Sequence, residues 1–235
     1  MTGRPFARPV MALLLAVPVP ALLRAQGSHE GPAAPVPLAT RWGIAAGMGV
    51  SYADAGDVVD VVNSVVDYSD RSQRFRAGVE FFGAVVVPLS DVVSLKLDYA
   101  YLLLSYNGST PFGPGDFTVK AHLPTLVLQY VLVDEGLYNV KGGAGVGYHF
   151  GGLSEQYGTV NGRFNGSGAG GLLELEANTA LGDHLFAYLG GTLRWDFIGT
   201  LTDDAGRTAG VNASGDAATL RFFSAGARLG LSYYF

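Results

Sequence analysis

From residue 41 onward, the sequence alternates with a period of two residues. In RWGIAAGMGVSYA, residues 41–53, large apolar side chains occupy every second position, and glycine, alanine and serine stand between them. Successive side chains of a β-strand point to opposite faces, so this pattern predicts a strand with one bulky apolar face and one small face. The pattern recurs in seven further segments: 74–87, 92–106, 117–133, 138–150, 168–181, 185–199 and 218–235. Each segment can cross a bilayer core at the usual tilt, for which about 9 to 11 residues suffice.

The connections between these segments alternate in length. Those at 88–91, 134–137 and 182–184 are short, whereas those at 54–73, 107–116, 151–167 and 200–217 are long and rich in Gly, Asp, Asn and Ser. Outer-membrane barrels combine short periplasmic turns with long extracellular loops. The sequence therefore predicts an all-β fold, a transmembrane eight-stranded antiparallel up-and-down β-barrel. Both ends of the mature chain would lie in the periplasm.

Charged residues of the predicted strands fall on the face that carries the small residues. Lys96 and Asp98, for example, alternate with Leu95, Leu97 and Tyr99. This parity alone would also suit a soluble barrel with its apolar face inside. Many glycines share the charged face, however, and small residues suit the crowded lumen of a narrow barrel, which bulky residues would overfill. We therefore expect the charges inside the barrel and the apolar side chains against lipid.

The inward polar residues are candidates for an ion-pair and hydrogen-bond network across the lumen. An eight-stranded barrel is just wide enough for side chains to fill, so such a network would close it. The alternative is that these charges gate a pore or line a polar ligand site. The candidate residues are Glu80, Lys96, Asp98, Lys120, His122, Glu174, Glu176, Arg194, Asp196 and Arg228.

The strand at 117–133 contains a proline that bears on its parity. If Lys120 and His122 face inward and the alternation continues, Gln129 would face lipid and Tyr130 would be hidden. Proline within a strand usually marks a bulge or an edge, and a closed barrel has no edge. We therefore predict a one-residue bulge near Pro124, which would turn Tyr130 toward lipid.

The N-terminus has the organisation of a secretory signal peptide. Arg4 and Arg8 precede an apolar run, which is interrupted by Pro18 and Pro20 and followed by a small-residue cleavage site that ends at Ala25. The run is shorter than the roughly 20 residues of a spanning helix, so a retained anchor is the weaker alternative. We expect a Sec-type signal peptide, a flexible periplasmic leader and an outer-membrane β-barrel at residues 1–25, 26–40 and 41–235.

Several classes of function are excluded or disfavoured by composition. The chain contains no cysteine, which excludes disulfides, thiolate catalysis and thiolate metal sites. It carries 15 basic and 20 acidic residues, and three of the basic residues lie in the predicted signal peptide, so nucleic acid is not an expected partner. The glycine-rich stretches lack a strand-to-helix context for phosphate binding, and no cofactor is inferred.

The first long connection, 54–73, carries five aspartates and two valine doublets. Calcium binds such oxygens, but the spacing lacks the glycine and closing glutamate of an EF-hand loop, which favours solvated surface carboxylates. The doublets Val58–Val59 and Val65–Val66 indicate an apolar stripe on a short helix or an extended hairpin. That stripe could instead contact lipid or a partner.

Catalysis is not supported by the histidines of the predicted barrel. Some outer-membrane barrels are enzymes that use His with Ser, or paired acids, at the membrane surface. His122, His149 and His184 lack a nearby nucleophile pattern, although His149 and Ser154 straddle a strand end. We therefore expect no catalytic or metal site, with a lipid-modifying enzyme as a remaining alternative.

The C-terminus resembles the assembly signal of bacterial outer-membrane barrels. That signal combines a polar residue, a glycine two positions later and aromatic residues near the end of the chain, here Arg228, Gly230, Tyr233 and Phe235. The resemblance implies recognition by the periplasmic barrel-insertion machinery.

A second resemblance involves VKAHLPTLVLQYVL (119–132) followed by VKGGAGVGYHF (140–150). These segments are similar to the OmpW family, in which a His-Leu-Pro strand leads to a Tyr-Val-Gly-Ala-Gly strand, and to the wider OmpA- and OmpX-like small barrels. Lys141–Gly142 replaces the aromatic start often found there. The resemblance covers about 30 residues and implies carriage of small apolar solutes.

Together these patterns predict a non-enzymatic protein of the outer membrane of a Gram-negative-type bacterium. It would contribute to envelope integrity and admit small apolar molecules, as a monomer surrounded by outer-membrane lipid and lipopolysaccharide. The alternative, from a different class, is a surface-recognition protein or adhesin whose long loops bind a partner while the barrel serves as a pedestal.

Overall fold

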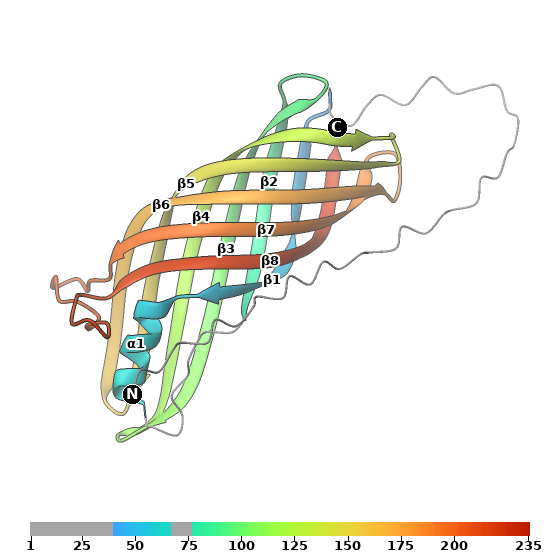
Figure 1. Cartoon of the computed structure of the whole chain (residues 1–235). Helices are drawn as coiled ribbons and strands as arrows, with labels where there is room; N and C mark the ends of the chain where they lie inside the picture. The colour runs from blue at the N-terminus through green and yellow to red at the C-terminus, as the bar shows by residue number, and fades with distance from the viewer. Residues whose placement is uncertain (1–39, 67–76) are drawn as a thin grey trace, which may run out of the picture. The chain divides into compact units, whose positions relative to one another are not determined.

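The computed structural model describes residues 40–66 and 77–235. Within these ranges the chain forms eight β-strands and one α-helix (Figure 1). In chain order they are β1 (Gly43–Asp54), α1 (Gly56–Val65), β2 (Gly78–Pro88), β3 (Val93–Thr110), β4 (Gly113–Asp134), β5 (Tyr138–Tyr157), β6 (Val160–Ala180), β7 (Leu185–Thr200) and β8 (Thr219–Tyr234). Each strand pairs antiparallel with the next, and β1 pairs with β8, which closes the barrel. The predicted up-and-down topology is confirmed.

The predicted signal peptide lies outside the described residues, as does nearly all of the predicted leader. Within the ranges that the structure describes, no helix is long and apolar enough to cross a membrane.

The barrel is organised inside out relative to a soluble protein. Outward positions carry exposed apolar side chains such as Met48, Leu97 and Leu175, whereas Lys96 and Arg228 are at most 1% exposed. A closed barrel leaves no unpaired strand edge, so an apolar exterior over a charged interior suits a transmembrane barrel.

Two belts of exposed aromatic side chains flank the outward apolar surface. The belt at the end with the short turns includes Trp42, Tyr130, Tyr138 and Tyr233, and the belt toward the other end includes Tyr99, Tyr148, Phe150 and Phe197. Aromatic belts of this kind lie at the two membrane–water interfaces. They bracket the part of the wall that spans the bilayer.

The parity of β4 differs from the prediction. Register with β3 is continuous past Pro124, and the irregularity in the pairing with β5 lies between Val131 and Val133. Pairing with β5 is interrupted beside the proline, which has no N–H to donate, and resumes in the same register at Thr125. No residue is inserted, so the predicted bulge near Pro124 is wrong. Tyr130 nevertheless faces outward.

Two of the predicted long loops are continuations of strands. Residues 107–110 and 113–116 extend the β3–β4 hairpin, and most of 151–167 extends the β5–β6 hairpin. Gly113, with φ +115°, and Gly158, with φ +54°, occupy backbone conformations at the tips that other residues rarely adopt. These strands run beyond the ends of their neighbours (Figure 1). The connection at 201–218, by contrast, contains only isolated bridges among its described residues.

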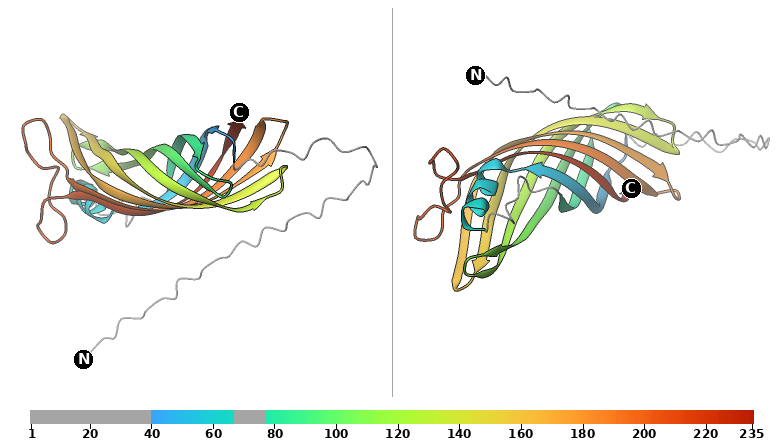
Figure 2. Two further views of the ribbon diagram at one scale, coloured as in Figure 1. Left: turned by 90° about the horizontal axis from the view of Figure 1, so that it is seen from above. Right: turned by 60° about the horizontal axis from the view of Figure 1, so that its bottom comes forward.

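Helix α1 lies at the barrel end that carries these extensions and the 201–218 connection (Figure 2). Its four buried residues are all valines, Val58, Val59, Val61 and Val62. Asp60 accepts a hydrogen bond from the Ala213 backbone N–H at 3.0 Å. Helix α1 therefore packs its apolar stripe inward. Of the two predicted forms of this segment, a short helix and an extended hairpin, the structure contains the helix.

Candidate functional site

The barrel interior has two layers of different chemistry. Toward the α1 end it is apolar, with the valines of α1 packed in one cluster with inward side chains of the wall, including Leu102, Leu104, Phe117, Val119, Leu123, Leu153, Ile198 and Leu220. Toward the short-turn end it is filled by buried ions and amides. The apolar layer explains the parity of β4, because Phe117 and Val119 are inside where α1 covers them.

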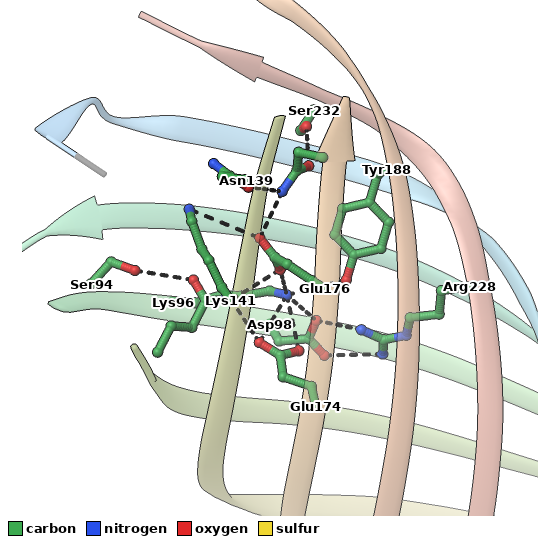
Figure 3. Close-up of polar contacts among 12 residues, drawn as sticks. Ser94, Lys96, Asp98, Asn139, Lys141, Glu174, Glu176, Tyr188, Arg228 and Ser232 are labelled. Carbon is green, nitrogen blue, oxygen red and sulfur yellow. Dashed lines mark hydrogen bonds and ion pairs between the residues drawn. The ribbon is translucent and has the colours of Figure 1, made fainter. Parts of the chain in front are cut away.

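Lys96 is the centre of the polar layer (Figure 3). Its ammonium donates to Glu174 Oε2 at 3.0 Å and to Glu176 Oε2 at 2.8 Å. The Gln129 amide donates to the same two carboxylates at 2.8 and 2.9 Å. One cation of β3 and one amide of β4 thus hydrogen-bond two carboxylates of β6, and the cation balances one of their two charges.

Arg228 forms a second centre. Its two terminal nitrogens donate to the two oxygens of Asp98 at 2.8 and 3.2 Å, and its Nε donates to Glu80 at 2.5 Å. Glu80 also accepts a hydrogen bond from the Ser51 hydroxyl at 2.8 Å, and Arg194 donates to Asp98 at 3.2 Å. The bidentate geometry between Arg228 and Asp98 fixes β8 relative to β3 across the lumen.

A chain of amides and hydroxyls continues the polar layer toward the short turns. The Asn178 amide donates to Asn139 at 2.9 Å and accepts from Ser232 at 2.6 Å. Lys141 donates to the Tyr234 hydroxyl at 3.1 Å. Buried polar groups are costly unless they are hydrogen-bonded, so this chain makes burial of the layer tolerable.

The structure places eight of the ten candidate residues inside the barrel. Among them, Asp196 is paired with His149. The eight are Glu80, Lys96, Asp98, Glu174, Glu176, Arg194, Asp196 and Arg228. Lys120 and His122 are corrected, because both face outward and are exposed. His122 hydrogen-bonds the Tyr99 hydroxyl at 2.6 Å on the outer wall.

Lys141, Gln129, Asn139 and Asn178 also belong to the network but were not among the candidates. Strand parity is the signal that could have found Lys141 and Asn178, since both share a face with charged residues. The inward orientation of Gln129 depends on the parity of β4. The predicted assembly residues Tyr233 and Phe235 face outward, while Arg228 serves in the network, and their role in assembly stays a prediction.

His149 is held between Asp196 and Thr125. Its Nδ1 pairs with Asp196, and its Nε2 is 3.1 Å from the Thr125 hydroxyl. A carboxylate, imidazole and hydroxyl in this order resemble a nucleophile with its base and orienting acid. All three side chains are buried, with exposures of 0–1%, and the Thr125 hydroxyl also contacts the Leu123 carbonyl at 3.2 Å. The arrangement therefore offers a substrate no access.

Glycines make the room that His149 needs. A Cβ on Gly170 would lie 2.2 Å from Nδ1 of His149, and a Cβ on Gly147 would lie 2.5 Å from Nε2. The predicted role of small residues on the charged face thus has a specific geometric basis here. Among the described residues, no group of three or more His, Cys, Asp or Glu side chains could hold a metal ion.

No protein-family model and no curated protein sequence matches the chain. The crystal structure of Neisserial surface protein A (NspA) is similar with a TM-score of 0.50 and 12% identity over 83% of this chain and 97% of that chain. The crystal structure of Ail, the attachment invasion locus protein of Yersinia pestis, is similar with a TM-score of 0.50 and 9% identity over 83% of this chain and 99% of that chain. At these identities the likeness concerns the fold, which is that of small bacterial outer-membrane β-barrels.

Proposed function

We propose that the protein is a non-enzymatic outer-membrane barrel with a closed lumen, which contributes to the integrity of the envelope. The observation that carries this proposal is the buried ion network, in which Lys96 and Arg228 link strands on different sides of the barrel. Charges paired in this way hold the wall together and leave the axis filled. The end with α1 would face the outside and both mature termini the periplasm, in keeping with the short turns at the opposite end.

Passage of small apolar solutes along the axis is not part of this proposal. A solute that entered under α1 would meet apolar side chains such as Leu102 and Leu153 first. It would then meet Lys96 and Arg194, which are ion-paired with carboxylates and at most 1% exposed. Moving an apolar molecule through such a layer would break several buried ion pairs.

Conductance in planar bilayers tests the closed lumen. The wild-type barrel is expected to give no steady current. Arg194→Ala combined with Glu174→Ala removes one cation and one carboxylate from the adjacent strands β7 and β6. Heat-modifiable mobility on a gel reports whether the variant still folds. A folded double variant with steady conductance would show that the network is a gate and not a structural plug.

Surface recognition is the second candidate function. It is supported by the β3–β4 and β5–β6 hairpins, which present rigid polar sheet beyond the outer aromatic belt, and by the adjacent 201–218 connection. Replacing residues 203–208 with a short Gly-Ser turn should abolish binding to a surface partner without loss of folding. Helix α1 is a poorer target for deletion, because its valines fill the barrel end.

The proposal that the protein is not an enzyme is supported by the burial of the Asp196–His149–Thr125 arrangement. Incubation of the detergent-solubilised barrel with phospholipid or lipopolysaccharide should release no fatty acid. Lipid deacylation that disappears in His149→Ala would contradict the proposal.

A further inference from the structure

A polar groove of about 1090 Å³ lies on the extension of β4, β5 and β6 beyond the outer aromatic belt. Its floor comes largely from outward positions of these strands, and residues 203–209 form a wall. Two cross-strand rows make up the floor. Asp116, Gln156 and Asn161 form one row, and Thr118, Ser154 and Arg163 form the next.

Two cations of this groove have no acidic partner. In the part of the chain that the structure describes, no carboxylate lies within ion-pair distance of Lys120 or Arg163. Arg207 on the wall, by contrast, is paired with Asp203 at 2.7 Å. Lys120 and Arg163 stand on β4 and β6, two strand spacings apart across β5 and offset by two residues along it, or roughly 12 Å apart. Their long side chains can therefore reach one bound group.

The groove begins where the aromatic belt ends. On β4, outward Lys120 is two residues from His122, whose ring packs 4.9 Å from that of Tyr101. On β5, outward Tyr148 and Phe150 precede Ser154, and the Tyr148 hydroxyl hydrogen-bonds Ser167 of β6 at 2.8 Å. Because aromatic belts mark the level of the headgroups, the floor lies directly above that level.

The chemistry of the lining selects for a ligand with both phosphate and hydroxyl groups. Arginine and lysine bind phosphate strongly. Three carboxylates of the lining, Asp116, Glu155 and Asp204, form no ion pair within the described residues and would repel a bare anion. These carboxylates accept hydrogen bonds from sugar hydroxyls, and the amides of Gln156 and Asn161 both accept and donate them. We infer that the groove binds a phosphorylated saccharide, with Lys120 and Arg163 on the phosphate and the amide row on the sugar. The ligand is either the headgroup of an outer-leaflet glycolipid or a free phosphosugar.

The test compares Lys120→Gln/Arg163→Gln with Arg41→Gln, which removes a cation outside the groove. Unchanged heat-modifiable mobility would verify that each variant folds. Each barrel is titrated with lipid A in phosphatidylcholine nanodiscs, with dephosphorylated lipid A in the same nanodiscs, and with the soluble phosphorylated disaccharide of lipid A. Binding is measured by native mass spectrometry.

We expect the groove variant to bind the phosphorylated probes at least about tenfold more weakly than wild type, and the control variant to bind like wild type. Binding to lipid A alone would identify the source as the membrane, and this arm rests on the orientation proposed above. Binding to the soluble disaccharide would identify a free ligand and is independent of that orientation. Equal losses in both variants, equal affinity for dephosphorylated lipid A, or no binding to either phosphorylated probe would overturn the inference.

Discussion

The Lys96 ammonium of β3 lies 2.8 Å from a carboxylate oxygen of Glu176 on β6. These strands are three positions apart around the closed sheet, so the ion pair crosses the lumen and does not follow the wall. Glu174 shares the same ammonium at 3.0 Å. Glu174 therefore depends on this one buried cation, whereas Glu176 also lies 3.9 Å from the buried ammonium of Lys141.

Lys96→Met should be strongly destabilising. The methionine keeps most of the side-chain volume but leaves Glu174 without a cation and Glu176 with only Lys141, at 3.9 Å. Breaking a buried pair by removal of one partner costs about 3 to 5 kcal/mol. Urea unfolding of the barrel in lipid vesicles should show a loss of this size in the free energy of unfolding.

Lys120→Met is the matched control, because this lysine is exposed on the outer wall. We expect a change within about 0.5 kcal/mol for such a surface substitution. A second variant, Lys96→Met/Glu174→Gln, should recover part of the loss by removing the carboxylate that has no other cation. Equal stability of Lys96→Met and wild type would contradict the account of the network.

Gly170→Ala should destabilise the barrel through His149. The added Cβ would lie 2.2 Å from Nδ1 and 2.3 Å from Cε1 of the imidazole, which Gly147 confines on the other side. Overpacking of this kind costs about 1 to 3 kcal/mol. Gly191→Ala is the control, since a Cβ there meets nothing within 4 Å. Thermal unfolding in detergent would compare them, and His149→Ala in the Gly170→Ala background should restore part of the loss if the clash is with the ring.

Strand number, the facing of strands such as β3, β6 and β7, and the burial of charges such as Glu174 and Arg194 could be predicted from the sequence. The reason is physical: in a narrow barrel, the period of two sorts side chains between lipid and a crowded lumen. The pairing of particular ions could not be predicted, because Lys96 meets Glu176 only through closure of the sheet and the register of several strand pairs.

The errors on Lys120 and His122 have one cause. The parity of β4 was inferred on the premise that the whole lumen is polar, so Phe117 was expected to face lipid. Helix α1 makes one end of the lumen apolar, and the sequence of β4 contains no local signal that this helix will cover it. The hairpin extensions were missed because their Gly, Asn and Ser content is typical of loops, although long-range pairing can hold such residues in strands.

Acid should loosen α1 through Asp57. Burial alone would raise the pKa of this carboxyl, but hydrogen bonds from the hydroxyl and amide of Thr219 and from Asn212, with the charge of Arg221, hold its pKa below the ordinary 3.8. The Thr219 hydroxyl donates to Asp57 at 2.6 Å. A depressed folded-state pKa means that the contribution to stability is complete above 3.8 and is lost as pH falls through the folded value.

Hydrogen exchange of the α1 amides, corrected for intrinsic rates, measures this loss. Wild type should keep its protection above the ordinary carboxyl value and lose it at lower pH. Asp57→Asn should show weaker protection with little pH dependence, and the exposed Asp204→Asn should follow wild type. An unchanged pH profile in Asp57→Asn would argue against this anchor.

Leu175→Arg tests which side of the wall contacts lipid. Leu175 is exposed and lies on β6 about midway between the two aromatic belts. An arginine on the lipid face costs about 2 to 4 kcal/mol at the bilayer midplane and about 0 to 1 near an interface. Leu181→Arg, at the short turn after β6, should therefore be nearly neutral. Similar unfolding free energies of the two variants in vesicles would contradict the inside-out arrangement.

Removal of Phe235 should impair assembly in cells more than folding in vitro. The residue contributes one backbone hydrogen bond, from its N–H to the Trp42 carbonyl at 2.9 Å, and an edge contact with Tyr233 at 5.1 Å between ring centroids. A bond of this kind contributes about 0.5 to 1.5 kcal/mol, too little to prevent refolding into detergent. If the terminal aromatic is read by the insertion machinery, the truncated chain should refold normally in detergent but give little heat-modifiable protein in the outer-membrane fraction. Addition of one alanine after Phe235 keeps both contacts while moving the terminus, and should reduce assembly as well. Normal assembly of both variants would show that Phe235 is only a structural residue of the last strand.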